Sequence, residues 1–173
     1  MALRVVVLAD THLRSTPRRG RPPRPLPDAV ISHLHGADAI LHAGDVLDAG
    51  VLDDLRGYGP VHAVLGNNDL QLTGVLPATR LIELDGVRVG MIHDSGPARG
   101  RAARMKRRFP DADVVVFGHS HAPVNEVSEA GQLLFNPGSP TQRRAQPVHT
   151  LGELRLQGGA VVGHRVIALD GGR

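Results

Sequence analysis

Seven side chains of metal-binding type occur in five short motifs of the sequence. The motifs are ADTH, GD, GNND, HD and GHSH, and each follows a short apolar run. Carboxylate, imidazole and amide groups suit Mn²⁺, Fe, Zn²⁺, Mg²⁺ or Co²⁺, and the chain has no cysteine that could offer a softer sulfur ligand. The seven residues are Asp10, His12, Asp45, Asn67, His93, His119 and His121.

This ligand set predicts a site for two metal ions. One catalytic zinc ordinarily takes about three protein ligands and a water, so the seven groups exceed what a single ion needs. Two ions roughly 3.5–4 Å apart can hold a bridging hydroxide and clamp the phosphoryl oxygens during an in-line displacement. The chemistry that these residues favour is therefore hydrolysis of a phosphate ester at a dinuclear centre with a bridging carboxylate.

The elements that must position these residues are five apolar runs rich in β-branched residues. They are LRVVVLAD, ADAILHAGD, PVHAVLGNND, VRVGMIHD and ADVVVFGH, and each ends in a candidate ligand. Because ligands collect beyond the carboxyl ends of strands in open α/β sheets, these groups are expected to converge. Residues two apart on an extended backbone project to the same side, which predicts two pairs, Asp10 with His12 and His119 with His121.

Helix candidates lie between several of these strands. PDAVISHLHG offers Asp28 as its N-cap and stops at Gly36, VLDDLRGYG is shorter, and ARGRAARMKRRFP ends before Pro110. The alternation of strands and helices indicates an α/β fold. The C-terminal third instead predicts two antiparallel hairpins, turning at Ala130-Gly131 and Gly158-Gly159. These patterns predict an α/β half with a second, antiparallel sheet packed on it.

Glycine precedes several of the ligands. A missing Cβ at Gly44 and Gly66 would let the chain turn sharply and approach the ions. Gly118 is expected to end its strand so that the two following histidines swing over the site.

Length and composition narrow the class of protein. A chain of 173 residues suits one domain, predicted to span residues 1–173. The N-terminal apolar run is too short for a signal peptide or a membrane span and no longer run follows, so we expect a cytoplasmic protein without a membrane segment. With a net charge of only +3 and few aromatic residues, binding to nucleic acid stays open but is not favoured.

Arginines gather in three segments. Those of the Arg/Pro loop (residues 14–27) are Arg14, Arg18, Arg19, Arg21 and Arg24. We favour a solvated loop there over one that overhangs the site and attracts an anionic ester. The run at 99–108 fits the wet face of a helix, whereas Arg143 and Arg144 are candidate phosphate contacts because a guanidinium fork matches phosphate oxygens.

Other polar residues are expected to act indirectly or not at all. Asp48 and Asp69 should brace loops or histidines, and His42 should have a buried or orienting role. Five further histidines lie on predicted helix or strand faces and are not expected at the site, namely His33, His35, His62, His149 and His164.

In order, the five motifs resemble the motif blocks of calcineurin-like metallophosphoesterases. The short length and the NPGSPTQRR segment are similar to the small YfcE-like phosphodiesterase branch, which is related to the phosphoesterase-like subunit of retromer. The likeness runs from residue 10 to residue 144. It implies an α/β fold in the form of a four-layer αββα sandwich, with two mixed β-sheets flanked by helices.

The resemblance also implies a role for each residue. One ion would be held by Asp10, His12 and His121, and the other by Asn67, His93 and His119, with Asp45 as the bridge. Mn²⁺ is the first expectation for both ions, with Fe, Zn, Ni, Co and Mg as alternatives. The catalytic residues would be Asp45, Asn67 and Asn68.

The chain departs from the family pattern in three places. Asn68 stands where better-known branches carry histidine, and an amide cannot deliver a proton at neutral pH, so we expect a preference for acidic leaving groups. The segment GDVLDAG lacks the arginine of Ser/Thr protein phosphatases, which argues against that branch. Asp94 stands where the small branch usually has glycine, and its role stays open.

The sequence is therefore interpreted as a metal-dependent phosphodiesterase. Its partner would be a phosphoester substrate, either a small molecule or a nucleotide-like compound, and a homo-oligomer is left open. The alternatives are a phosphomonoesterase and a catalytically weak scaffold that keeps the fold. Loss of metal ligands would mark such a scaffold, and none is lost, so Asn68 alone keeps that alternative open.

Overall fold

The computed structural model describes residues 1–17 and 20–169. Its first sheet has the strand order β10-β9-β1-β2-β3. The strands β1, β2 and β3 are parallel, whereas β9 pairs antiparallel with both β1 and β10. Their bounds are β1 Leu3–Leu8, β2 Ala39–His42, β3 Val61–Ala63, β9 His149–Gln157 and β10 Ala160–Leu169.

The second sheet has the order β4-β5-β6-β8-β7. Its three central strands β5, β6 and β8 are parallel, and the edge strands β4 and β7 are antiparallel to their neighbours. Their bounds are β4 Thr79–Leu84, β5 Val87–Ile92, β6 Val114–Val116, β7 Val124–Val127 and β8 Leu133–Asn136.

The five predicted strands are confirmed as β1, β2, β3, β5 and β6. The two predicted hairpins also form, but the expected separate antiparallel sheet is wrong. The β7–β8 hairpin joins the second sheet beside β6, and the β9–β10 hairpin joins the first sheet beside β1. Since β8 and most of β9 are buried, both faces of these strands must be covered, which their places inside the two sheets provide. Both sheets are consequently mixed, as the family resemblance implied.

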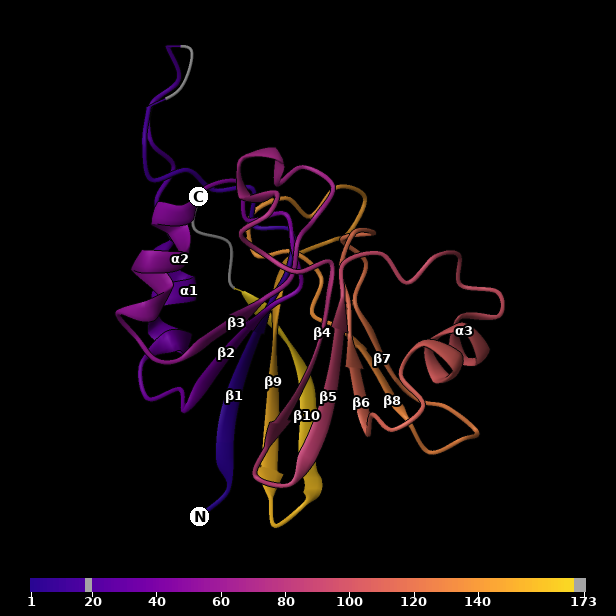
Figure 1. The fold of residues 1–173 in the computed structure, drawn as a ribbon. Coiled ribbons are helices and arrows are strands. Elements are labelled where there is room, and N and C mark those ends of the chain that lie inside the picture. The colour runs from indigo at the N-terminus through magenta and orange to yellow at the C-terminus, as the bar shows by residue number, and fades with distance from the viewer. Residues whose placement is uncertain (18–19, 170–173) are drawn as a thin grey trace.

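Three helices complete a four-layer sandwich (Figure 1). The helices α1 (Asp28–Leu34) and α2 (Ala49–Arg56) cover the outer face of the first sheet, and α3 (Arg101–Arg108) covers that of the second. The N-cap of α1 is Pro27 rather than the predicted Asp28, which is the first helical residue. A short 3₁₀ helix, η1 (Leu70–Leu72), lies between β3 and β4.

Apolar side chains fill each interface of the sandwich. Val7 and Leu41 of the first sheet pack with Met91 and Phe135 of the second sheet, and all four are fully buried. Separate clusters hold α1 and α2 on one outer face and α3 on the other. Within the described residues, no helix has both the length and the apolar character needed to cross a bilayer.

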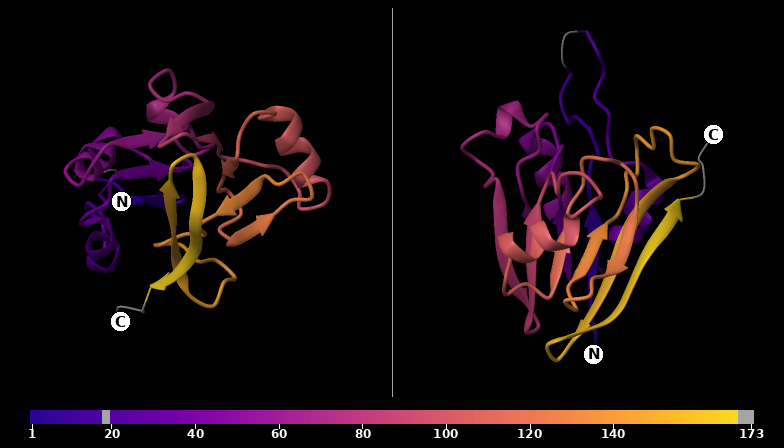
Figure 2. Two further views of the ribbon diagram at one scale, coloured as in Figure 1. Left: turned by 90° about the horizontal axis from the view of Figure 1, so that it is seen from below. Right: turned by 90° about the vertical axis from the view of Figure 1, so that its right-hand side faces the viewer.

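The fold brings the carboxyl ends of five strands to one end of the sandwich. The ends of β1, β2 and β3 from the first sheet lie there beside those of β5 and β6 from the second, at the top of Figure 1. The described part of the Arg/Pro loop projects from this same end, as the right-hand view of Figure 2 shows. The predicted ligands follow these five strand ends, so the topology alone brings them together.

Candidate metal centre

The first group of predicted ligands consists of Asp10, His12 and His121. His121 Nε2 lies 3.5 Å from Asp10 Oδ1 and 3.4 Å from His12 Nε2. One ligand atom of each residue lies within 4.8 Å of the other two, so the three could share one ion. The loops after β1 and β6 supply this group, and it spans both sheets.

Asp45 lies between this group and a second one. Its Oδ2 atom is 3.4 Å from His12 Nε2 and 3.5 Å from His93 Nε2. That is where a carboxylate shared by two ions would stand. Asp10 Oδ1 also comes within 4.0 Å of His93 Nε2, so Asp10 borders both groups, which the sequence did not predict.

Asn67 and His119 extend the second group. The Asn67 Oδ1 atom is 3.0 Å from His93 Nε2 and 3.0 Å from His119 Nδ1. The structure thus gathers all seven predicted ligands at one place.

The predicted extended backbone at the paired ligands is wrong. Asp10 and His12 have φ angles of 54° and 45°, and His119 and His121 have φ angles of 67° and 57°. These are left-handed conformations that cost energy for residues with a Cβ and that cluster at functional sites. Asp10 and His12 do share a group, but His119 and His121 turn to different groups.

Close packing requires glycine at the positions before ligands, as Gly66 and Gly118 show. A Cβ on Gly66 would lie 2.1 Å from the backbone nitrogen of Asp45. A Cβ on Gly118 would lie 2.8 Å from both the Cβ of Ala9 and Oδ2 of Asp10. Besides following the end of β6, as predicted, Gly118 lets the end of this strand approach the end of β1.

The NPGS segment and the residues after it hold the ligand loops through hydrogen bonds. Ser139 Oγ donates to the backbone oxygen of Asp10 at 2.8 Å, and the Thr141 hydroxyl donates to that of Thr11. His121 Nδ1 donates to the carbonyl of Gln142, which leaves Nε2 facing Asp10. The roles of Ser139 and Thr141 were not predicted from the sequence, although their place in and next to the NPGS turn was a usable signal.

Asp69 and His42 brace the loop that carries Asp45. The Asp69 carboxylate accepts hydrogen bonds from the backbone N–H groups of Asp45, Leu47 and Gly66 at 2.7–2.9 Å. His42 is fully buried, and its Nδ1 accepts from Gly44 N at 3.2 Å. Burial lowers the pKa of His42 to about 3, so the ring stays neutral. These bracing contacts agree with the predicted roles.

The Asp10 carboxylate is the clearest sign that the cluster can bind a cation. Its two oxygens are buried and have no hydrogen-bond partner among the described residues. An isolated carboxylate in such surroundings is costly unless it is paired or binds a metal. Burial raises the pKa of Asp10 to about 7 despite the nearby His93. The residues present therefore fit a divalent ion.

The pKa values of the surrounding histidines shift in different directions. Burial lowers the pKa of His12 to about 4 and also lowers that of His121, so both rings are neutral and able to bind a metal at pH 7. Burial acts the same way on His93, but its hydrogen bonds to Asp45 and to the Ala43 carbonyl, together with the charges of Asp45 and Asp10, outweigh burial and raise the pKa. His93 Nδ1 donates to the backbone oxygen of Ala43 at 2.7 Å, which directs Nε2 toward the cluster.

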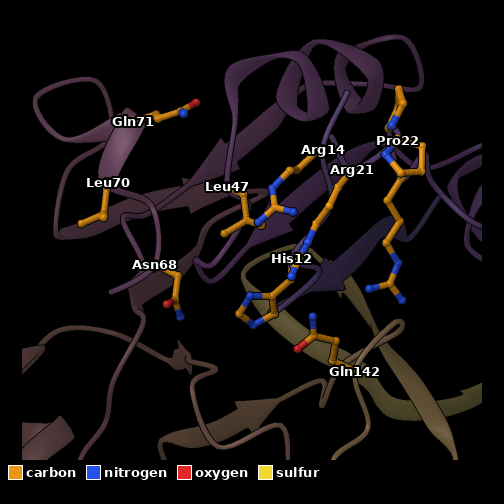
Figure 3. A pocket seen from close by; sticks show the side chains of 11 residues that line it. His12, Arg14, Arg21, Pro22, Leu47, Asn68, Leu70, Gln71 and Gln142 are labelled. Atoms are coloured by element: carbon orange, nitrogen blue, oxygen red, sulfur yellow. The ribbon is translucent and has the colours of Figure 1, made fainter. Parts of the chain in front are cut away.

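Residues 20–25 of the Arg/Pro loop are exposed, as expected of a solvated loop, but several of its side chains also border the site. Arg14, Arg21 and Arg24 line a cavity of about 500 Å³ that also borders His12 and Asn68 (Figure 3). The other two arginines of the loop, at positions 18 and 19, lie outside the residues that the structure describes.

The two arginines after the NPGS turn have different surroundings. Arg144 Nη1 donates to the backbone oxygen of His119 at 3.3 Å, and its charge helps to lower the pKa of His12 after burial and other causes. Arg143 instead donates to the carbonyls of Gln146 and Pro147 in its own loop. Of these two arginines, Arg144 is thus the one beside the cluster.

The remaining polar residues lie at the periphery. The Asp94 side chain is 58% exposed, accepts from Gly96 N, and places Oδ2 4.0 Å from His119 Nε2, on the outer side of the ring. Asp48 caps α2 and accepts from Ser15. As expected, none of the other five histidines belongs to the two groups formed by the described residues.

Comparison with known proteins identifies the family. A model of the calcineurin-like phosphoesterase superfamily domain matches residues 3–159. The chain belongs to this superfamily. A relative of this phosphoesterase from Methanothermobacter thermautotrophicus, described as a probable metallophosphoesterase, is 36% identical over 141 residues, which cover 80% of this chain and 77% of the relative.

Solved structures share the fold of this phosphoesterase. Vacuolar protein sorting 29 from Cryptosporidium parvum superposes with a TM-score of 0.74 at 19% identity, over 96% of this chain and 98% of that protein. A protein described as a novel archaeal phosphodiesterase superposes with a TM-score of 0.71 at 20% identity, over 96% and 99%. At these identities the likeness concerns the fold alone, so the argument for activity depends on the site.

Proposed function

We propose that this phosphoesterase is a dinuclear metal-dependent phosphodiesterase. The observation that carries the proposal is the position of the Asp45 carboxylate, which lies 3.4 Å from His12 and 3.5 Å from His93 and so joins the two ligand groups. Asp10, His12 and His121 would hold one ion and Asn67, His93 and His119 the other, with Mn²⁺ as the first choice. When bound, the ions would supply a hydroxide nucleophile and neutralise charge on the phosphoryl oxygens.

Asn68 would position Asp45 and contact the substrate. Its backbone N–H donates to Asp45 Oδ1 at 2.9 Å and its side-chain amide donates to Oδ2 at 2.7 Å. Since Asn68 is exposed at the rim, its amide could also donate to an ester oxygen. It cannot protonate a leaving group, so esters of acidic alcohols such as nitrophenol should react fastest.

Open space on both sides of the cluster supports a diester substrate. One side is the cavity bordered by His12 and Asn68, and the other is a cleft of about 270 Å³ lined by Ser95, Gly118 and His119. A diester carries two organic arms on its phosphorus, and each side has room for one. A monoester would leave one of these spaces unused.

The fold does not choose between an enzyme and a scaffold, because both the phosphodiesterase and vacuolar protein sorting 29 share it. The ligand set favours the enzyme. A scaffold would have no need of an unpartnered buried carboxylate such as Asp10, whose cost is offset only when a cation binds.

The decisive experiment compares bis(p-nitrophenyl) phosphate with p-nitrophenyl phosphate as substrates. Protein stripped of metal and reloaded with Mn²⁺ should hydrolyse the diester faster, and Asp45→Asn should abolish turnover. Asp54→Asn, an exposed aspartate of α2, is the matched control and should keep full activity. Faster hydrolysis of the monoester would identify a phosphomonoesterase, and no turnover with two bound ions would favour the scaffold.

A further inference from the structure

The cavity next to His12 carries a positive charge that metal-assisted hydrolysis does not require. Arg14, Arg21 and Arg24 line it, and none of the residues that form its wall is acidic. It borders both His12 and Asn68, so one molecule could place a group in this cavity and a phosphorus atom at the metal centre.

The protein's own acids do not neutralise these arginines. Within the described part of the chain, none of the three forms an ion pair, whereas Arg4, elsewhere on the first sheet, pairs with Glu153 at 2.7 Å. Asp48, which lines a neighbouring cleft together with Arg14, accepts from Ser15 and caps α2. A cavity with three cations and no counter-charge is complementary to an anion.

Two of the three arginines, Arg14 and Arg24, are held in place by hydrogen bonds. Arg14 and Arg24 pair across its base, with N–H donations at 3.2 Å and 2.8 Å in the two directions. Arg24 Nη2 also donates to the Thr141 carbonyl at 3.0 Å, which ties the loop to the segment that supports the ligands. The base of the Arg/Pro loop is therefore a fixed wall of the cavity.

Apolar groups share the cavity with the arginines. Figure 3 shows Asn68, Leu70 and Gln71 on one side and Pro22 on the other, with His12 between them. Leu70 is 78% exposed, so its apolar surface is open to a ligand in the cavity. An organic ring could pack against Leu70 and Pro22 while an attached anion meets the arginines.

We propose that this cavity binds a second phosphate group on one organic arm of the phosphodiester substrate. The inference rests on the proposed function, since it places the scissile phosphorus at the metal centre. The substrate class is then an organic phosphodiester, of nucleotide type, that bears a further phosphate one sugar-sized unit away. Arg14, Arg21 and Arg24 act as residues that determine specificity.

Binding to metal-stripped protein tests the cavity without any catalysis. Calorimetry should show that thymidine 5′-monophosphate, whose phosphate can enter the cavity, binds at least roughly tenfold more tightly than uncharged thymidine, since each charge-assisted contact is strong. Arg21→Gln should lower this preference by roughly tenfold, and Arg14→Gln should do the same. Arg107→Gln, on the exposed face of α3, is the matched control and should leave the preference unchanged.

Kinetics with Mn²⁺-loaded protein separate the two proposals. The p-nitrophenyl ester of thymidine 5′-phosphate is compared with the same ester bearing a 3′-phosphate, and the ratio of their kcat/KM values should fall in Arg21→Gln. Hydrolysis of both esters at equal kcat/KM, with no binding preference, overturns the cavity's role and leaves the phosphodiesterase intact. Tighter binding of the monophosphate than of thymidine, without hydrolysis of either ester, supports the anion site and contradicts the proposed function.

Discussion

Two buried carboxylates of the first sheet have opposite surroundings, one without partners and one with several. Asp10, at the end of β1, is fully buried, and neither of its oxygens has a hydrogen-bond partner among the described residues. Glu153, within β9, is 2% exposed and is surrounded by the guanidinium groups of Arg4, Arg155 and Arg165 at 2.7, 3.2 and 2.9 Å.

Their pKa values move in opposite directions as a result. Burial raises the pKa of Asp10 to about 7. Burial acts the same way on Glu153, but the hydrogen bond from Arg4 and the charges of the arginines outweigh it and lower the pKa. A carboxylate that the protein supplies with its own cations stabilises the fold, whereas one left without a partner reserves a place for a cation from solution.

The largest effect should follow from Asp10→Asn. The substitution removes the negative charge that both ligand groups share, so Mn²⁺-dependent diester hydrolysis should fall by more than about 100-fold, beyond what loss of a merely orienting partner costs. Glu153→Gln should keep the activity within about twofold, because the site lies at a different place on the sheet. Steady-state kinetics and Mn²⁺ titration calorimetry measure the activity and metal affinity of the two variants. Comparable losses in both would contradict the contrast drawn between Asp10 and Glu153.

The next effect concerns the stability of Glu153→Gln. Neutralising this residue leaves three arginines without a counter-charge near a buried amide, and we expect a loss of about 2–3 kcal/mol in the free energy of unfolding at pH 7. Urea denaturation of metal-free protein gives the value. Because the lowered pKa makes the Glu153 contribution present above its ordinary pKa of 4.5 and lost as pH falls, the difference from wild type should shrink in acid.

Asp10→Asn should have the opposite effect on the metal-free fold. The folded pKa of about 7 exceeds the ordinary 3.8, so the folded state retains a proton that the unfolded state has lost, and stability falls as pH rises between these values. The variant escapes this loss and should be more stable than wild type by about 1–3 kcal/mol at pH 8, with no gain near pH 4. A gain of equal size at both pH values would disprove the mechanism.

The smallest effect is expected for Arg165→Gln. This arginine is 63% exposed, and Glu153 keeps two other partners when it is removed. We therefore expect a change below about 1 kcal/mol in the free energy of unfolding. A larger loss, measured by the same denaturation, would mean that the three arginines act as a cooperative network.

The sequence revealed the type of each site residue but not its conformation. Asp10 and His121 were found because both follow β-branched runs, and the topology brings such strand ends together. The left-handed φ angles at both residues leave no pattern in a single sequence. The contact of Ser139 with the Asp10 backbone joins segments 129 residues apart, and spacing alone could not reveal it.

For the fold, the elements were predictable from the sequence but their placement was not. Alternating strand and helix patterns gave the α/β core correctly, and turns such as that at Gly131 gave the hairpins. Which sheet each hairpin joins depends on the burial of β8 and β9 against partners elsewhere in the chain, so a local pattern could not decide it. The reach of the Arg/Pro loop to the cavity likewise depends on the cross-loop pairing of Arg14 with Arg24.

The contact between Ser139 and the Asp10 loop has a consequence for biogenesis. The first ligand motif emerges early in synthesis, but its support arrives with residues 139–142, and the first sheet is incomplete until β9 pairs with β1. Contacts of such long sequence separation form late and slowly in folding. A nascent chain would therefore carry its ligands long before it could use them, and metal loading would be one of the last steps of maturation.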